Sequence, residues 1–209
     1  MIFDLWDTLI RWDQAVGDEF FADVAELLGS TPEETLSAWD EGRSARSSGP
    51  MLDYLRTLGL EDGVAAAIVE RRRELARRAI VPVDGAVETI RELRDGGLKV
   101  GLLSVCSDEV PAVWAETAFA GLFDAEVFSC DVGLLKPDPR IYALTCERLR
   151  VQPHEALFVG DGANDELAGA ERAGLRAVQI LLYGEPRWPE SRDWQGPRVS
   201  SPSQVLELV

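Results

Sequence analysis

Short apolar runs alternate with amphipathic stretches from about residue 83 to residue 182, and this alternation limits the possible folds more than any other feature. Helical stretches between strands are the crossover connections that parallel strands need. We therefore predict an α/β fold, a Rossmann-like parallel sheet with helices on both faces. The predicted strands are KVGLLSV (99–105), AEVFS (125–129), ALFVGD (156–161) and RAVQILL (176–182), and the predicted helices cover about 84–95, 109–118, 138–149 and 166–174.

The segment 14–80 differs from the rest of the chain, because it contains amphipathic helical stretches and no clear strand. These stretches are FFADVAELL, EETLSAW, MLDYLRTL and AAAIVERRRELARR. We predict that 14–80 is an all-helical cap domain, inserted after a very short first strand. The core domain then comprises 1–13 and 81–209. Its tail, 183–202, is predicted to be an ordered surface loop before a short last strand or helix.

The composition excludes several classes of function. With 37 acidic and 21 basic residues, the net charge of −16 repels nucleic acid and anionic membranes. No apolar run approaches the ~18 residues that span a membrane. The three cysteines lack C-x-x-C spacing, and the first ten residues carry acids where a signal peptide has bases. We expect a cytoplasmic monomer or homodimer whose partner is a small molecule, not nucleic acid or a membrane.

Polar residues collect where the predicted strands end, which is the edge at which open parallel sheets bind ligands. Several carboxylates in one crevice repel one another without a cation, so we expect an oxygen-liganded divalent ion, Mg²⁺. The chain has 19 arginines and two lysines, and Lys136 therefore suggests a need for a compact point charge. The residues at the strand ends are Asp4, Trp6, Thr8, Ser104, Lys136, Asp161 and Asp165.

The segments FDLWDTL, LLS, KPDP and VGDGANDELAGAERAG, in this order, resemble the four motifs of the haloacid dehalogenase-like (HAD) hydrolase superfamily. The helical insertion after the first motif resembles the type 1 cap of subfamily I. The resemblance covers nearly the whole chain. A Walker loop and a dinucleotide-binding G-x-G-x-x-G are both absent from the sequence, which excludes the main rival nucleotide-binding folds.

The resemblance implies a role for each motif residue. Asp4 would be the nucleophile, which forms a covalent aspartyl intermediate. Lys136 would stabilise the negative charge of Asp4 and of the transferring group, while two hydroxyls would hydrogen-bond the phosphoryl oxygens. The catalytic residues would be Asp4, Thr8, Ser104 and Lys136. The Mg²⁺ ligands would be Asp4, the Trp6 carbonyl and Asp161, with Asp165 on a metal-bound water or on the lysine.

Trp6 departs from the family pattern, in which a second aspartate stands two residues after the nucleophile. That spacing puts both side chains on one side of an extended segment, so the second acid can protonate the leaving oxygen. Asp7 is one residue too far along and occupies a place where relatives usually have glycine. It is therefore either a turn residue or a substitute acid.

Three functions remain open on these motifs. The first is a Mg²⁺-dependent phosphohydrolase of a small phosphorylated metabolite, acting through an aspartyl-phosphate. The second is a 2-haloacid dehalogenase, whose halide leaving group needs no proton and whose pattern also has an aromatic residue at the Trp6 position. Asp161 argues against it, because metal-free dehalogenases lack that ligand. The third is a catalytically weakened binding protein, against which Asp4, Lys136 and Asp161 argue.

Arg43, Arg46 and Trp6 are the candidates for substrate binding. Arg43 and Arg46 lie in the segment GRSARSSGP, which is predicted to be a Gly/Ser-rich cap loop that can reach over a crevice, and Trp6 is expected to line the same pocket. His154 is predicted to be a surface residue, and Cys106 and Cys130 to be small buried side chains. The arginines of RRRELARR (71–78) are predicted to form the solvated face of a cap helix.

Overall fold

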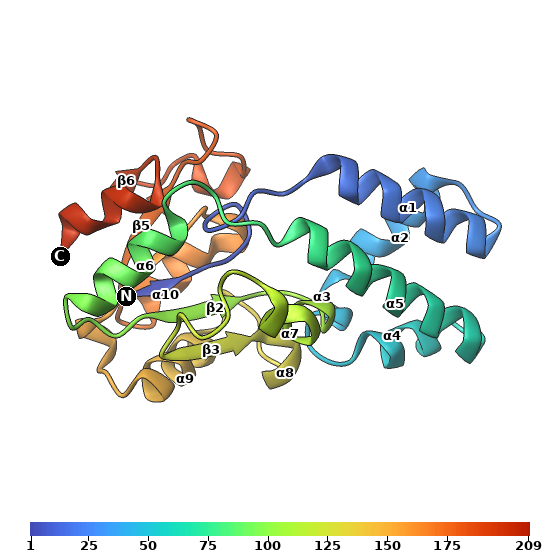
Figure 1. The fold of residues 1–209 in the computed structure, drawn as a ribbon, viewed down its shortest axis with the longest axis horizontal. Coiled ribbons are helices and arrows are strands. Elements are labelled where there is room, and N and C mark those ends of the chain that lie inside the picture. The colour runs from blue at the N-terminus through green and yellow to red at the C-terminus, as the bar shows by residue number, and fades with distance from the viewer.

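A computed structural model describes residues 1–209 of the protein. Six parallel strands form one sheet in the order β3-β2-β1-β4-β5-β6 (Figure 1). The predicted α/β fold is confirmed. The strands are β1 (Ile2–Phe3), β2 (Gly101–Ser104), β3 (Ala125–Phe128), β4 (Leu157–Gly160), β5 (Arg176–Ile180) and β6 (Arg198–Val199).

Each face of the sheet has its own apolar core, because neighbouring strand residues point to opposite faces. Leu102 belongs to the same apolar cluster as Ile90, whereas Leu103 belongs to the cluster of Tyr142. The first face is covered by α6 (Ala86–Asp95), α7 (Glu109–Val113) and the 3₁₀ segment η5 (Pro202–Leu208). The second is covered by α9 (Pro139–Leu149) and α10 (Glu166–Arg172). Shorter elements are η1 (Trp114–Glu116), α8 (Ser129–Val132), η2 (Pro153–Glu155), η3 (Ala163–Asp165) and η4 (Pro189–Ser191).

Five helices between β1 and α6 lie to one side of the sheet and pack on one another (Figure 1). Their apolar core includes Phe20, Trp39, Met51 and Ile68. Local signals start and stop them: Thr31 and Glu34 form a capping box at the start of α2, and Gly29 ends α1 with a left-handed φ of 65°. The helices are α1 (Gln14–Leu28), α2 (Pro32–Glu41), α3 (Arg43–Arg46), α4 (Met51–Thr57) and α5 (Asp62–Ala79).

The structure differs from the sequence prediction in three segments. The Gly/Ser-rich segment expected to be a loop contains the short helix α3. The helix expected over 109–118 is divided into α7 and the 3₁₀ turn η1. The tail 183–202 contains η4 and β6, and β6 adds a sixth strand beside β5. No helix combines the length and the apolarity needed to cross a membrane.

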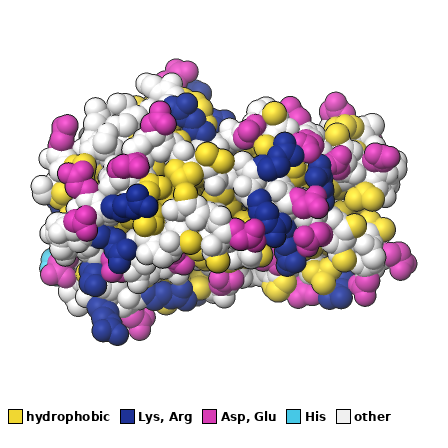
Figure 2. Space-filling model, viewed as in Figure 1, with side chains coloured by type: hydrophobic (Ala, Val, Ile, Leu, Met, Phe, Trp, Pro, Cys, Tyr) yellow, Lys and Arg dark blue, Asp and Glu magenta, His cyan; other side chains and the backbone are white.

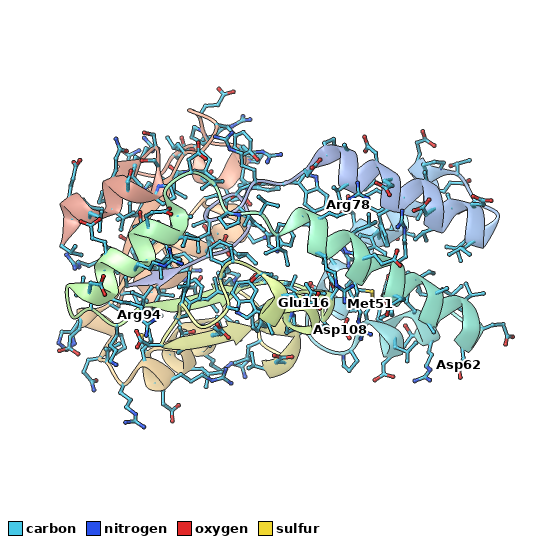
Figure 3. All side chains as sticks on the ribbon, in the orientation of Figure 1. Met51, Asp62, Arg78, Arg94, Asp108 and Glu116 are labelled. Atoms are coloured by element: carbon cyan, nitrogen blue, oxygen red, sulfur yellow. The ribbon has the colours of Figure 1, made fainter.

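Polar contacts join the helices α1–α5, here called the cap helices, to the domain that contains the sheet. The Met51 backbone N–H donates to Asp108 Oδ2 at 3.3 Å, and both residues lie at the junction in Figure 3. Arg72, on α5, donates to Glu109 Oε1 at 3.0 Å and keeps only 12% of its side chain exposed. The sequence predicted that the arginines of 71–78 form a solvated helix face, and Arg72 is an exception to this prediction. Figure 2 shows basic and acidic side chains side by side over this half of the molecule.

Candidate active site

Two aspartates meet at the carboxyl edge of the sheet because the strands before them are neighbours. β1 lies between β2 and β4, with Phe3 paired to Val159. Asp4 follows β1, and Asp161 follows β4. The chain leaves β1 toward β2 on one side and returns to β4 on the other. Such a switch point is where open α/β sheets bind ligands.

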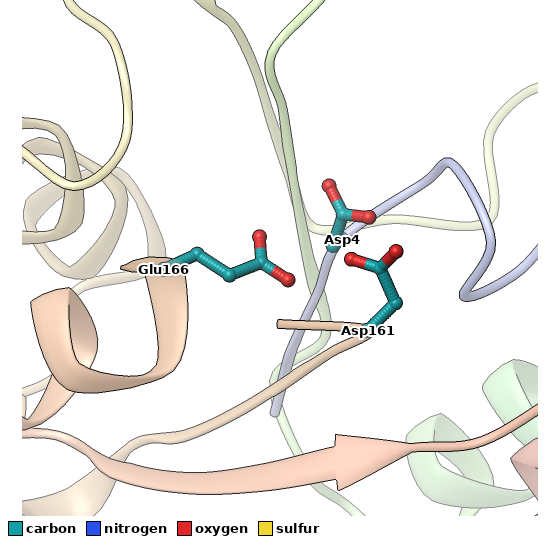
Figure 4. A group of neighbouring side chains, drawn as sticks. All are labelled: Asp4, Asp161 and Glu166. Carbon is teal, nitrogen blue, oxygen red and sulfur yellow. The ribbon is translucent and has the colours of Figure 1, made fainter. Parts of the chain in front are cut away.

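A third carboxylate, that of Glu166, completes the acidic cluster (Asp4, Asp161 and Glu166). Figure 4 shows the three side chains turned toward one another, and ligand oxygens of all three lie within 4.8 Å of one another. Lys136 Nζ donates to Asp4 Oδ1 and to Glu166 Oε2, at 2.5 Å each. All four side chains are buried. Three carboxylates therefore face a single ammonium group.

The acid of motif four that contacts Lys136 is Glu166 and not Asp165. The Asp165 carboxylate is half exposed and pairs with Arg172 at 3.3 Å. Asn164 and Asp165 both have left-handed φ values, 52° and 59°, and this turn precedes the first residue of α10. The lysine contact expected as one alternative for Asp165 is therefore made by Glu166, one residue later. A metal contact of Asp165 stays a prediction.

Two glycines make room for Glu166. A Cβ on Gly160 would lie 2.2 Å from Glu166 Oε1, and a Cβ on Gly169 would lie 2.6 Å from the Pro137 Cβ. Gly169 lets α10 pack against the segment that carries Lys136. Glu166 and Gly169 are three residues apart and share one helix face. This spacing, E-x-x-G at the start of a helix, is the sequence signal that the prediction missed.

The acidic cluster carries more negative charge than its surroundings neutralise. Burial and the facing charge of Asp4 raise the pKa of Asp161 to about 6. Complete burial also raises the pKa of Glu166 well above its ordinary value. Burial alone would lower the pKa of Lys136, but the charges of Asp4 and Glu166 raise it, so this lysine stays protonated. An added cation would relieve the repulsion between the carboxylates.

Of the two predicted site hydroxyls, that of Thr8 has a hydrogen-bond partner and that of Ser104 has none. Thr8 Oγ1 donates to Asp4 Oδ2 at 3.2 Å. Ser104, at the end of β2, is fully buried and its hydroxyl has no hydrogen-bond partner. A buried polar group without a partner costs free energy. Binding of a phosphoryl oxygen by Ser104 stays a prediction.

The order of motifs and this geometry agree with a comparison against family models. A model described as haloacid dehalogenase-like hydrolase matches residues 1–174. The chain belongs to this family of hydrolases. It is therefore an enzyme, as the motifs predicted.

Relatives of this HAD-like hydrolase include proteins of two activities. The (S)-2-haloacid dehalogenase 4A of Burkholderia cepacia is 35% identical over 63% of this chain, and the match spans just over half (56%) of the dehalogenase. The glyceraldehyde 3-phosphate phosphatase of Methanopyrus kandleri is 32% identical over 74% of this chain and 69% of the phosphatase. The phosphoserine phosphatase of Thermus thermophilus is 31% identical over 86% of this chain and 71% of that protein.

Solved structures show the same division. A HAD phosphatase from Thermococcus onnurineus superposes with a TM-score of 0.72 at 21% identity, over 99% of this chain and 95% of the other. A dehalogenase superposes with a TM-score of 0.65 at 27% identity, over 100% of this chain and 95% of the other. The fold is thus shared with both activities and does not by itself choose between them.

Trp6 lies between the two halves of the HAD-like hydrolase. Its indole is half-buried and packs edge-on against Trp12, with ring centroids 5.7 Å apart. It contacts the apolar cores of both the sheet and the cap helices. The ring therefore bridges the two apolar cores, and it offers no acidic proton. A metal contact of its carbonyl remains a prediction.

Asp7 is a buried turn residue with both carboxylate oxygens engaged. Its φ is 53°, a conformation that glycine adopts most easily and that Asp tolerates. Oδ1 accepts from the Trp12 backbone at 3.0 Å and from the Tyr183 hydroxyl at 2.7 Å. Arg187 donates to Oδ2 at 2.7 Å. Both oxygens are thus occupied by donors of the turn and of the C-terminal segment, so the turn role is favoured over the substitute acid.

Asp7→Asn is expected to leave kcat/KM within about threefold of wild type and to lower the free energy of unfolding by about 1 kcal/mol. The amide keeps the acceptor oxygen and tolerates the left-handed φ, but it loses the ion pair with Arg187. Urea denaturation and steady-state kinetics would measure the two effects. A large loss of activity without a loss of stability would instead make Asp7 the acid.

The cap arginines have unequal environments. Arg43 is exposed and pairs with Asp40 at 3.4 Å. Arg46 is buried, donates to the Trp39 carbonyl and stacks on the Trp39 ring at 4.2 Å. Burial and the charge of Arg72 lower the pKa of Arg46 to about 10. Arg46 has no carboxylate within ion-pair distance, whereas Arg43 has one.

The remaining residues singled out from the sequence lie outside the acidic cluster. His154 is exposed in η2. Cys106 and Cys130 are buried and form no disulfide. Burial raises the pKa of the Cys106 thiol well above its ordinary value, which keeps this sulfur protonated and unreactive.

Proposed function

We propose that this HAD-like hydrolase is a Mg²⁺-dependent phosphohydrolase of a small phosphorylated metabolite and that it acts through an aspartyl-phosphate on Asp4. The observation that carries the proposal is the acidic cluster. A nucleophilic carboxylate gains nothing from two further buried carboxylates unless a cation besides Lys136 lies among them, because like charges in a buried site repel strongly and one ammonium group cannot neutralise three carboxylates.

The donors of the cluster suit magnesium. They are all oxygens, and Mg²⁺ prefers a few carboxylates together with water and phosphate oxygens. Asp4, Asp161 and Glu166 would hold the ion, together with the Trp6 carbonyl predicted from the motif. When bound, Mg²⁺ would neutralise the charge that develops on the phosphoryl group.

The residues of the chain divide the reaction into two displacements. An oxygen of Asp4 attacks phosphorus, an Asp4–phosphorus bond forms, and the bond to the leaving oxygen breaks. Water then attacks the same phosphorus, the bond between phosphorus and the Asp4 oxygen breaks, and inorganic phosphate leaves with the carboxylate restored. The leaving oxygen takes a proton from solvent, and the attacking water gives one up to solvent. Lys136 orients the nucleophile by donating to Asp4 Oδ1, and the unpartnered Ser104 hydroxyl is available for a phosphoryl oxygen.

One observation favours the second candidate function, a 2-haloacid dehalogenase. The side chain two residues after Asp4 is an indole, and a departing halide needs no proton. Assays of the purified protein against phosphomonoesters and 2-haloacids, each with Mg²⁺ and with excess chelator, separate the two. Metal-dependent phosphate release supports the proposal, and chelator-resistant halide release contradicts it.

Because position 6 carries an indole and not a carboxyl group, we expect the rate to depend steeply on the leaving group. Acyl and aryl phosphates should be hydrolysed far faster than alkyl phosphates, because their leaving oxygens need little protonation. Trp6→Asp should then raise kcat/KM for alkyl phosphates by at least about tenfold, since general acid catalysis contributes 10²- to 10⁴-fold where it operates. A series of substrates of increasing leaving-group pKa measures the slope.

Trp6→Asn is the matched control for that change. It removes the same indole and nearly the same volume but adds no proton donor. An equal gain in both variants would show that the tryptophan only blocks the pocket. A flat dependence in wild type would show that another group already supplies the proton.

A further inference from the structure

The segment Leu182–Ser191, here called the C-terminal strap, crosses the loops that carry the active-site acids. Arg11 donates to the Leu182 carbonyl at 3.0 Å. Tyr183 and Arg187 both donate to Asp7, in the loop after β1. Farther along, the Asn164 backbone N–H donates to Glu190 Oε1 at 2.8 Å, in the loop after β4. The strap therefore restrains both loops at once.

Within the strap, Trp188 contacts the acidic cluster directly. Its indole Nε1–H donates to Asp161 Oδ2. The other carboxylate oxygen, Oδ1, accepts from the Ala163 backbone at 3.1 Å. With one donor on each oxygen, the carboxylate has a set rotation about its side-chain bonds. We propose that Trp188 is a positioning residue, whose N–H holds the Asp161 carboxylate in the orientation that binds Mg²⁺.

The surroundings of Trp188 keep the indole in place. The Ser191 hydroxyl donates to the Trp188 carbonyl at 2.9 Å, which closes a turn in the strap. Buried Gln179, on β5, donates to the Asp161 carbonyl at 3.1 Å and to the Ser191 carbonyl at 3.4 Å. A strand of the sheet thus ties the strap to the residue that Trp188 contacts.

Gly162 permits this close approach. It has a φ of +96°, and a Cβ there would lie 2.4 Å from the Ser191 Cβ. Any larger residue would push the strap away from the loop. Gly162 thus leaves the space that the strap needs for Trp188 to reach Asp161. Groups that orient a metal ligand from outside are worth about 10- to 100-fold in metal affinity.

This inference rests on the proposed function, because it concerns Mg²⁺ binding. The test compares wild type with Trp188→Phe, which keeps an aromatic ring and removes the N–H donor. Isothermal calorimetry with MgCl₂ alone measures the affinity without any substrate. Trp194→Phe is the matched control, because the Trp194 indole donates at 3.2 Å to the Pro197 carbonyl and to no residue of the acidic cluster.

Trp188→Phe is expected to raise the Mg²⁺ dissociation constant about 10- to 100-fold. At saturating Mg²⁺, kcat should stay within about threefold of wild type, because the chemistry of Asp4 is unchanged. Trp194→Phe should leave both values unchanged. A change in kcat with an unchanged metal affinity would point to a general structural role and overturn the proposal.

Two other results would also overturn it, and they are distinguishable. Equal or tighter Mg²⁺ binding by Trp188→Phe would mean that the indole is neutral or competes with the metal, while the phosphohydrolase proposal stands. If the wild-type protein bound no Mg²⁺, the proposed metal site would be wrong, and the proposed Mg²⁺-dependent function would fail as well.

Discussion

Asp4→Asn is expected to lower kcat by at least about three orders of magnitude with any substrate that wild type turns over. The amide has the shape of the carboxylate, but its oxygen is too weak a nucleophile to form the covalent intermediate. The fold should persist, because the substitution removes one of three mutually repelling charges and keeps an oxygen that can accept from Lys136 or Thr8. Circular dichroism and thermal denaturation would establish that the variant is folded.

Asp7→Asn is the natural comparison for this variant, since it makes the same chemical change three residues away. Asp7 is equally buried but faces Arg187 and Tyr183, outside the acidic cluster. Inactivity of Asp4→Asn alone would support Asp4 as the nucleophile. Retention of most activity by Asp4→Asn would rule out covalent catalysis at this residue.

Asp161→Asn is expected to weaken Mg²⁺ binding at least about 100-fold, because even outer-sphere partners of a metal ligand are worth about 10- to 100-fold. Phosphatase activity should fall with it at ordinary Mg²⁺ concentrations and should recover in part at high Mg²⁺. Calorimetry with MgCl₂ and a titration of activity with Mg²⁺ provide the measurements. Excess chelator should stop the wild-type enzyme in the same way.

Asp165→Asn tests the placement of the acids in motif four. Its carboxylate is half exposed and pairs with Arg172, so the variant should bind Mg²⁺ as wild type does. Glu166→Gln, in contrast, removes a buried carboxyl group beside Lys136 and should weaken Mg²⁺ binding. If Asp165→Asn weakened Mg²⁺ binding and Glu166→Gln did not, Asp165 would be the metal ligand, as the sequence predicted, and the assignment of Glu166 would be wrong.

Much of the fold followed from local patterns in the sequence. Strands and helices have side-chain periods of two and 3.6, and these periods are visible within a few residues. Parallel strands also place all their carboxyl ends at one edge. This is why Asp4, Ser104 and Lys136, which are far apart in the chain, could be predicted to lie together. In the structure Lys136 donates a hydrogen bond to Asp4.

The tertiary structure alone decided which neighbours the acids have. Glu166 rather than Asp165 contacts Lys136, because Asn164 and Asp165 both adopt left-handed φ values just before α10 begins at Glu166. Motif spacing does not report such a turn, because Asn and Asp also occur in ordinary loops.

The strap shows the same limit over a longer range. Asp7 meets Arg187 across 180 residues, and Asp161 meets Trp188 across 27. Short-range periodicity determined the elements and the edge at which the site forms, because it reflects contacts within one helix or strand. The partners of Asp7 and Asp161 depend on the path of a connection between β5 and β6, and that path is set by packing on the finished sheet.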